Sequence, residues 1–230
     1  MFRGWQKVSY IEYPGNIATV LFTAVCNFRC PYCHNPELVE SPQILPEVKE
    51  EEVLQYLEER KGLIDAICIT GGEPLLWKEE LLPFLAKVKE QGFKVKVDTN
   101  GSSYSSFLVF KELVDLWGID YKVPLPLYRL VQGEKEIQSV REVVQEALKF
   151  PEKVEFRTTI FPPFHRKEIL LEMAENIKSA YTWYWQNFNP FKTLDPQAQK
   201  VTPYPLSLLQ NWQEEINQEM GKDLVVIRPS

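Results

Sequence analysis

Short runs of β-branched and aromatic residues recur along the chain, and each is followed by a stretch with apolar residues at helical spacing. A short run of this composition is typical of a buried strand, whereas apolar residues three or four positions apart, such as Val53 and Leu57, are typical of an amphipathic helix. The pattern therefore predicts alternating strands and helices. The six expected strands are residues 17–23, 66–70, 94–99, 118–123, 154–160 and 181–188.

Alternating strands and helices specify a parallel sheet, because the chain returns to the start of each parallel strand through a crossover helix. Six strand–helix units are too few to close the eight-stranded barrel. We therefore expect an α/β fold that forms a partial (β/α)6 barrel, with the parallel sheet open on one side. Helix signals agree with this alternation. Gly62 and Gly92 each follow a predicted helix, and Pro46, with Glu47 and Glu50 behind it, predicts the start of another.

The length of 230 residues and the ordinary composition, 44% hydrophobic and 25% charged, fit one globular domain. After Asn189 the chain becomes rich in proline, then resumes a helical pattern over residues 206–220 and reaches a possible last strand, DLVVI. We expect a single domain over residues 1–230, within which residues 189–230 form a C-terminal appendage.

The charge and the N-terminal sequence limit the partners. A formal net charge of −6 disfavours nucleic acid. The N-terminus has no apolar core of signal-peptide length, and no window approaches the ~20 apolar residues that a membrane span requires. These patterns predict a cytoplasmic protein without a membrane partner. Because thiols stay reduced in the cytoplasm, a tight group of cysteines indicates a metal or redox site there rather than disulfides.

Three of the four cysteines, Cys26, Cys30 and Cys33, lie close together directly after the first predicted strand. Parallel α/β folds place their ligands just past the carboxyl ends of the strands. Three thiolates suit zinc or an iron–sulfur cluster, but a closed zinc site needs a fourth ligand, and His34 is badly spaced to supply it. A [4Fe–4S] cluster on three cysteines keeps one iron open to a substrate. The fourth cysteine, Cys68, alternates within an apolar strand and is predicted to be a small buried hydrophobe.

The C-x3-C-x2-C spacing after the first strand resembles the signature of the radical S-adenosylmethionine (SAM) enzymes. The run CNFRCPYCHNPELV, with YPG before it and GGEPLL, DTNG, EFRTT and FNPFKTLDP after it, is similar to the activating proteins of anaerobic ribonucleotide reductase, which are glycyl-radical enzyme activases. This resemblance covers most of the chain. It implies that the three cysteines hold a [4Fe–4S] cluster, whose fourth iron is chelated by SAM.

The resemblance also implies an activity and partners. The reduced cluster would cleave SAM to methionine and a 5′-deoxyadenosyl radical, which abstracts hydrogen from a glycine of anaerobic ribonucleotide reductase. An electron donor such as flavodoxin or ferredoxin would be a second partner. Two alternatives stay open: a radical SAM enzyme that acts on another glycyl-radical enzyme or a small molecule, and a non-catalytic iron–sulfur electron-transfer or zinc-binding protein.

Two further strand ends carry candidate site residues. In TGGEPLL, Gly71 and Gly72 permit close approach of a ligand and Glu73 stands at the strand end, although a tight strand-to-helix turn explains them equally well. The resemblance implies that this turn meets the amino group of SAM. At the next strand end, turn chemistry alone also explains Asp98 and Asn100. The resemblance places both in the cofactor or substrate pocket.

Lys122 and Arg157 interrupt the apolar surroundings of the fourth and fifth strands, and a buried cation needs an anionic partner. A guanidinium matches a carboxylate bidentately, so Arg157 is the first candidate for the SAM carboxylate and Lys122 the second; either could instead face solvent. The resemblance implies that Tyr32, between the second and third cysteines, packs by the adenine. Val25 stands where members of the family often have glycine.

Overall fold

The computed structural model describes residues 1–228, which form two compact units. The boundary between the units passes through strand β5 (Leu116–Asp120). The first unit contains Met1–Asn27, Asn35–Thr99 and Ser103–Trp117, and the second contains Phe28–His34, Asn100–Ser102 and the chain from Gly118 onward.

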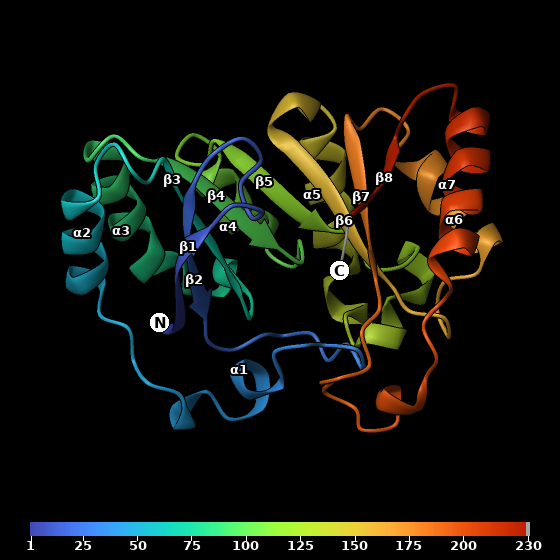
Figure 1. The fold of residues 1–230 in the computed structure, drawn as a ribbon, viewed down its shortest axis with the longest axis horizontal. Coiled ribbons are helices and arrows are strands. Elements are labelled where there is room, and N and C mark those ends of the chain that lie inside the picture. Colours follow the sequence, from blue (N-terminus) through green and yellow to red (C-terminus); the bar gives the residue numbers. More distant parts are fainter. Residues whose placement is uncertain (229–230) are drawn as a thin grey trace. The chain divides into compact units, whose positions relative to one another are not determined.

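The first unit is built on four strands that lie in chain order (Figure 1). The first strand runs antiparallel to the second, whereas the second, third and fourth are parallel. The parallel register places Val20, Cys68 and Lys96 side by side on successive strands. The strands are β1 (Phe2–Ser9), β2 (Ala18–Thr23), β3 (Ala66–Gly71) and β4 (Lys94–Thr99).

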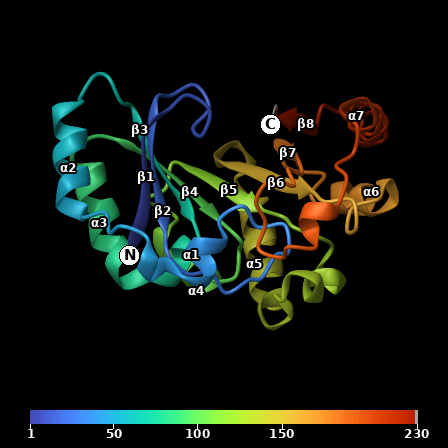
Figure 2. The same cartoon turned by 60° about the horizontal axis from the view of Figure 1, so that its bottom comes forward.

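Helices of the first unit cover its strands. Figures 1 and 2 show α2 and α3 side by side along one side of the strands. The apolar stripe of α3, which includes Leu81, Phe84 and Val88, is fully buried, and Phe84 packs against Phe2 of β1. The helical segments are α1 (Pro36–Glu40), η1 (Pro42–Ile44), α2 (Glu50–Glu59), η2 (Pro74–Trp77), α3 (Lys78–Glu90) and α4 (Tyr104–Phe110).

The second unit contains three parallel strands, also in chain order. Its last two long helices lie side by side next to β7 and β8 (Figures 1 and 2). The strands are β6 (Val154–Ile160), β7 (Thr182–Asn187) and β8 (Val225–Arg228), and the long helices are α5 (Ile137–Ala147), α6 (Lys167–Asn176) and α7 (Leu206–Met220). The shorter segments are η3 (Leu125–Val131), η4 (Glu134–Glu136), η5 (Pro151–Lys153) and η6 (Ala198–Lys200).

The α/β class and the parallel pairing of successive strands are confirmed. The segments predicted at 94–99, 154–160 and 206–220 coincide with β4, β6 and α7. Gly62 and Gly92 adopt positive φ angles just after α2 and α3, as expected of helix ends. The division into one domain with an appendage over residues 189–230 stays a prediction, and the last two residues of that range lie outside the described part.

On the N-terminal side, one strand was not predicted and one predicted helix start was wrong. Strand β1 was not predicted, because its sequence, FRGWQKVS, is not a β-branched run; it forms by antiparallel pairing with β2. The helix expected to start at Pro46 starts at Glu50 instead. Its N-cap, Lys49, is extended, and the backbone N–H of Val48 donates to the carbonyl of Phe2 at 3.2 Å, which ties this segment to β1.

Within residues 1–228, no helix is both long and apolar enough to cross a membrane.

Candidate cofactor site

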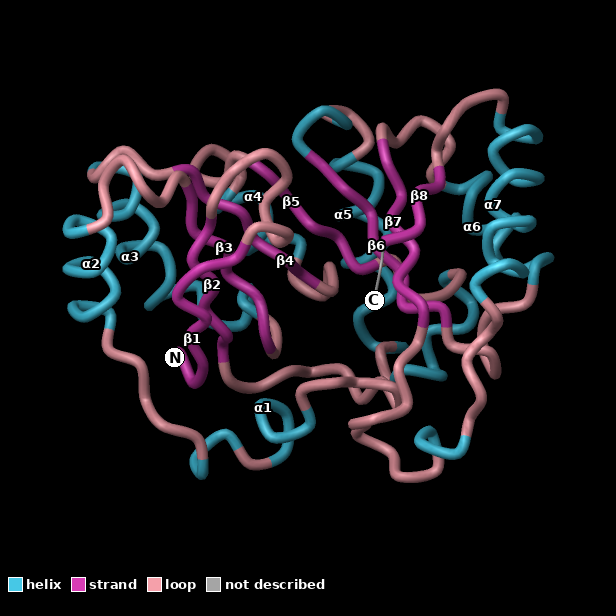
Figure 3. Tube along the Cα trace, in the orientation of Figure 1, coloured by secondary structure: helices cyan, strands magenta, loops and turns pink. Residues whose placement is uncertain are grey.

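The loop between β2 and α1 carries the C-x3-C-x2-C motif (Figure 3). Cys26 belongs to the first unit, whereas Cys30 and Cys33 belong to the second. All three cysteines are reduced and lie outside any disulfide. The backbone N–H of Cys33 donates to the carbonyl of Cys30 at 3.0 Å, which closes a tight turn around Pro31 and Tyr32. This turn brings Cys30 and Cys33 together.

Cys30 is the most enclosed cysteine of the motif. Burial raises the pKa of its thiol to about 11, although the nearby positive charge of Lys122 opposes this effect. Burial also raises the pKa of the neighbouring Tyr32 hydroxyl. A thiol with such a pKa stays protonated at neutral pH, so a metal that binds there displaces its proton.

The part of the cysteine loop in the second unit is held by aromatic packing. The ring of Tyr32 lies 5.3 Å from Phe161 and 5.9 Å from Phe164, measured between centroids. Phe28 packs edge-on against Tyr128 at 6.0 Å. A Cβ atom at Gly133 would lie 2.8 Å from the Phe28 ring, so only glycine lets this ring sit where it does. The aromatic side chains of the motif therefore act as anchors.

Backbone and histidine contacts hold the same loop from the side of residues 188–195. The backbone N–H of Asp195 donates to the carbonyl of Pro31 at 3.0 Å. His34 Nε2 lies 3.0 Å from the carbonyl of Asn189, and its ring stacks on Phe188. The segment after β7 thus supports the last part of the cysteine motif.

In the first unit, the TGGE turn packs directly on the backbone that leads to Cys26. The N–H groups of Gly72 and Glu73 donate to the carbonyls of Thr23 and Val25, each at 2.8 Å. An added Cβ would lie 2.6 Å from the Thr23 nitrogen at Gly71 and 2.0 Å from the Val25 carbonyl oxygen at Gly72. Both glycines are required by this close approach of two backbones.

Glu73 is fully buried, and its carboxylate organises the same turn. Its Oε1 accepts from the backbone N–H of Leu75 at 3.0 Å, which caps η2, and from the Thr99 hydroxyl at 2.7 Å. These bonds link the ends of β3 and β4. The contact of this turn with the SAM amino group stays a prediction.

Val25 adopts a φ angle of +64°, in the left-handed region. A β-branched residue is strained there, because its side chain crowds the backbone. Glycine, which the resemblance implies for many relatives at this position, adopts such an angle without strain.

Asp98 and Asn100 occupy different surroundings. Asp98 is buried in β4, pairs with the buried ammonium of Lys96 at 3.3 Å, and accepts a contact from the Cys68 thiol at 3.7 Å. Cys68 is fully buried, as predicted, but its thiol also meets this carboxylate. Asn100 belongs to the second unit, where its Oδ1 accepts from the backbone N–H of Ser102 at 2.8 Å. This is the turn chemistry considered as the alternative for Asn100.

Arg157 and Lys122 share one carboxylate, Asp120, at the end of β5. The Asp120 Oδ1 accepts from Arg157 Nη2 at 2.8 Å and Nε at 3.1 Å, and Oδ2 lies 3.2 Å from Lys122 Nζ. Burial acts to raise the pKa of Asp120, but the two cations outweigh it and hold the pKa at about 2. The three residues carry a net charge of +1. The anionic partner that buried cations require is thus Asp120.

Asp120 was not among the predicted site residues, although the sequence carries a signal for it. Asp120 and Lys122 are two positions apart near the end of an extended strand, where alternate residues share a face. A carboxylate in this position is the natural partner for a cation that follows it.

His165 also has a structural role that its sequence surroundings do not indicate. It is fully buried in the turn between β6 and α6. Its Nδ1 accepts from the backbone N–H of Phe161 at 2.9 Å, so the ring proton is on Nε2, which donates to the Lys122 carbonyl at 2.7 Å. Burial lowers the pKa of the imidazole to about 4. His165 is therefore neutral at physiological pH.

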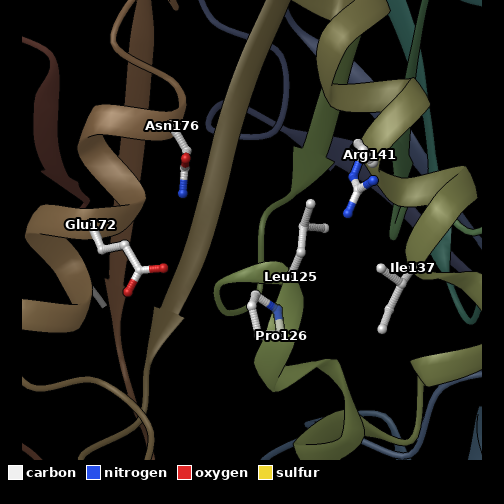
Figure 4. A pocket seen from close by; sticks show the side chains of 6 residues that line it. All are labelled: Leu125, Pro126, Ile137, Arg141, Glu172 and Asn176. Carbon is white, nitrogen blue, oxygen red and sulfur yellow. The ribbon is translucent and has the colours of Figure 1, made fainter.

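The second unit also has an open depression of about 290 Å³ between η3, α5 and α6 (Figure 4). None of the predicted site residues lines it. Its lining residues are Leu125, Pro126, Ile137, Arg141, Glu172 and Asn176.

Comparison with known proteins shows the family of the chain. The radical SAM superfamily model matches residues 20–175. A Methanocaldococcus jannaschii protein, MJ1227, whose name assigns it to the glycyl-radical enzyme activating enzymes, is 30% identical over 99% of this chain and 95% of its own. The pyruvate formate-lyase-activating enzyme of Clostridium pasteurianum is 29% identical over 82% of this chain and 81% of its own.

Solved structures show the same fold. SuiB from Streptococcus suis superposes with a TM-score of 0.65 at 14% identity over 91% of this chain, which spans about half (48%) of the SuiB chain. A domain of the pyruvate-formate lyase-activating enzyme from Bacteroides vulgatus superposes with a TM-score of 0.56 at 18% identity, over 72% of this chain and 99% of that domain. These similarities confirm the expected α/β fold with its open parallel sheet.

The expected cofactors, a [4Fe–4S] cluster and SAM, are those of the matched superfamily, and the relatives agree with an enzyme of this kind. The superfamily match and the relative that aligns along nearly the whole sequence show that this chain belongs to the radical SAM superfamily, among its glycyl-radical enzyme activating enzymes.

Proposed function

We propose that this protein installs a glycyl radical on anaerobic ribonucleotide reductase. The observation that carries the proposal is the alignment with an activating enzyme over 99% of the chain, with the C-x3-C-x2-C motif intact. Support for the reductase as target comes from the resemblance of the longer motifs, CNFRCPYCHNPELV and FNPFKTLDP, to its activating proteins. Flavodoxin or ferredoxin is the proposed electron donor.

The side chains present fit a cluster with three cysteine ligands. Cys26, Cys30 and Cys33 are reduced cysteines on one loop, and soft thiolates are the donors that iron–sulfur clusters use. Cys68 lies within β3 and directs its thiol toward Asp98, so it is not part of this loop's donor set. A reduced cluster held by these three cysteines would supply the electron for the cleavage of SAM to methionine and a 5′-deoxyadenosyl radical, and this radical would take a hydrogen atom from the target glycine.

Charged residues of the second unit supply the means to bind the carboxylate of SAM. Lys122 and Arg157 together exceed the charge of Asp120 by one unit, and a carboxylate that joins them makes the group neutral. Such charge-assisted hydrogen bonds are strong where water is scarce. We assign Arg157 and Lys122 to this carboxylate.

The remaining assignments follow the same proposal. Gly71, Gly72 and Glu73 meet the amino group of SAM, and Tyr32 packs by the adenine. Asp98 and Asn100 line the cofactor or substrate pocket. The protein works as a single radical SAM domain, with residues 189–230 as an appendage.

A cysteine comparison tests the chemistry. The purified protein is reconstituted anaerobically with iron and sulfide, reduced in the presence of SAM, and assayed for 5′-deoxyadenosine. The native protein is expected to form this product, the Cys26→Ala variant to lose both cluster and product, and the matched Cys68→Ala variant to keep both. An intact cluster without product would contradict the proposal. One zinc per chain without iron or sulfide would favour the zinc-binding alternative instead.

A further inference from the structure

His165 joins the turn after β6 to the end of β5 through two hydrogen bonds. One runs from the Phe161 N–H to Nδ1 at 2.9 Å, and the other runs from Nε2 to the Lys122 carbonyl at 2.7 Å. The ring is fully buried. The backbone of Lys122 is therefore fixed by a rigid side chain that is distant in sequence.

The residue fixed in this way belongs to the charged group of the second unit. Lys122 pairs with Asp120, and Asp120 is held by two hydrogen bonds from Arg157. The Tyr121 N–H also donates to the Arg157 carbonyl at 2.9 Å, so the backbones of β5 and β6 meet beside this group. A shift of the Lys122 backbone would move its ammonium away from Asp120.

The same turn contacts the cysteine loop. Phe161 and Phe164 both belong to the turn that His165 closes, and both pack against Tyr32. The Phe164 ring also lies against the His165 ring, with 6.3 Å between centroids. His165 thus stands between the aromatic contacts of the cysteine motif and the Lys122–Asp120–Arg157 group.

We infer that His165 is a positioning residue for SAM binding: its Nε2–H bond to the Lys122 carbonyl sets the Lys122 ammonium where it receives the SAM carboxylate. This inference rests on the proposed function, which assigns that carboxylate to Lys122 and Arg157. His165 does not touch SAM in this account. It acts only through the backbone at the end of β5.

The two ring nitrogens of His165 can be tested separately. An asparagine amide reaches about as far as Nδ1 and can accept from Phe161 but not reach Lys122, whereas a glutamine amide reaches about as far as Nε2 and can still donate to Lys122. A role confined to the β6–α6 turn requires the Nδ1 contact. A positioning role requires the Nε2 contact. The two roles therefore predict opposite rankings of SAM affinity: a positioning role predicts weaker binding by His165→Asn, and a role confined to the turn predicts weaker binding by His165→Gln.

The experiment measures SAM dissociation constants by equilibrium dialysis on anaerobically reconstituted proteins, with iron content and circular dichroism recorded for each. We expect His165→Asn to bind SAM about tenfold more weakly, the effect of one lost buried hydrogen bond, and His165→Gln to stay within about twofold of native. Iron content should not change in either variant. If His165→Asn does not fold, His165→Leu, which lacks both hydrogen bonds, takes its place with the same expected weakening.

A double variant checks that the effect passes through Lys122. Lys122→Met alone should weaken SAM binding, and adding His165→Asn should weaken it no further, because both changes remove the same interaction. The inference would be overturned if the double variant lost SAM affinity additively, or if the native protein and His165→Asn bound SAM equally well. It would also be overturned if SAM affinity fell in His165→Gln but not in His165→Asn. Absence of SAM binding by the native holoprotein would instead overturn the proposed function.

Discussion

Single backbone positions around the cysteine motif are fixed by contacts that few residue types allow. Gly72 has no room for a side chain against the Val25 carbonyl, and Val25 itself has a φ angle of +64° that suits glycine. Both residues lie where the TGGE turn meets the start of the cysteine loop. Their substitution tests whether this local geometry is correct.

Replacing Val25 with glycine should stabilise the protein. Glycine adopts a positive φ without strain, so the substitution removes a backbone strain of about 1–3 kcal/mol. This gain exceeds the entropic cost of ordering a glycine, so the free energy of unfolding should rise by about 1 kcal/mol. Val8 in β1 is the matched control, because both valines are 40% exposed and only Val25 has a positive φ. Val8→Gly should destabilise by about 1 kcal/mol. Urea unfolding measures both changes, and equal losses in the two variants would contradict the strained geometry.

Replacing Gly72 with alanine should be strongly destabilising. The new methyl would lie 2.0 Å from a backbone carbonyl oxygen that cannot move without breaking the hydrogen bond to Glu73. We expect a loss of about 3 kcal/mol in the free energy of unfolding. Gly62→Ala is the control, because Gly62 has a positive φ but open space around it, and should cost only ~1 kcal/mol. Similar losses for both variants in urea unfolding would show that the turn does not approach the loop this closely.

At the scale of elements, the sequence pattern predicted those strands and helices whose own residues carry a clear apolar period. Strands β4 and β6 and helix α7 have apolar periods of their own and were predicted to the residue. Strand β1 has no such pattern and forms by pairing with β2, and Val48 is held by β1 outside the helix expected from Pro46.

Among site residues, contacts between partners that are far apart in the sequence could not be predicted. The sequence indicated that Arg157 needs an anion, but it is the strand arrangement that supplies Asp120, 37 positions away. The bond from His165 to Lys122 spans 43 positions and leaves no trace in either local sequence. The cysteine motif could be read from the chain because its members are neighbours along it.

The buried His165 links two elements and gives the stability a pH dependence. Its pKa is lowered to about 4 in the folded state against 6.5 in the unfolded chain, so the unfolded state binds the proton first as the pH falls. The stability contributed by the neutral ring is fully present above pH 6.5 and is lost as the pH falls toward 4. Between pH 7 and pH 5 this loss is about 2 kcal/mol.

Chemical denaturation of the native protein and of His165→Gln at the two pH values checks this effect. The variant lacks the titrating ring, so its free energy of unfolding should fall by about 2 kcal/mol less than that of the native protein over the same interval. Parallel pH dependences in the two proteins would mean that His165 is not buried as a neutral ring.

At the scale of the whole molecule, one loop contributes to both compact units. Cys26 lies with the TGGE turn in the first, and Cys30 and Cys33 lie with Lys122 and the aromatic anchors in the second. The same chain aligns with an activating enzyme along nearly its whole length. These observations support the account in which a cluster and SAM on this protein generate a radical for a protein partner.

The most direct test of that account is electron paramagnetic resonance of the partner. The reconstituted, reduced protein is incubated anaerobically with SAM and the anaerobic ribonucleotide reductase of the same organism, with pyruvate formate-lyase as the parallel partner. We predict a glycyl-radical doublet on the reductase, formed with one 5′-deoxyadenosine per radical and absent with the Cys26→Ala variant. A doublet only on pyruvate formate-lyase would contradict the proposed target, and SAM cleavage without a radical on either partner would contradict the glycyl-radical activity itself.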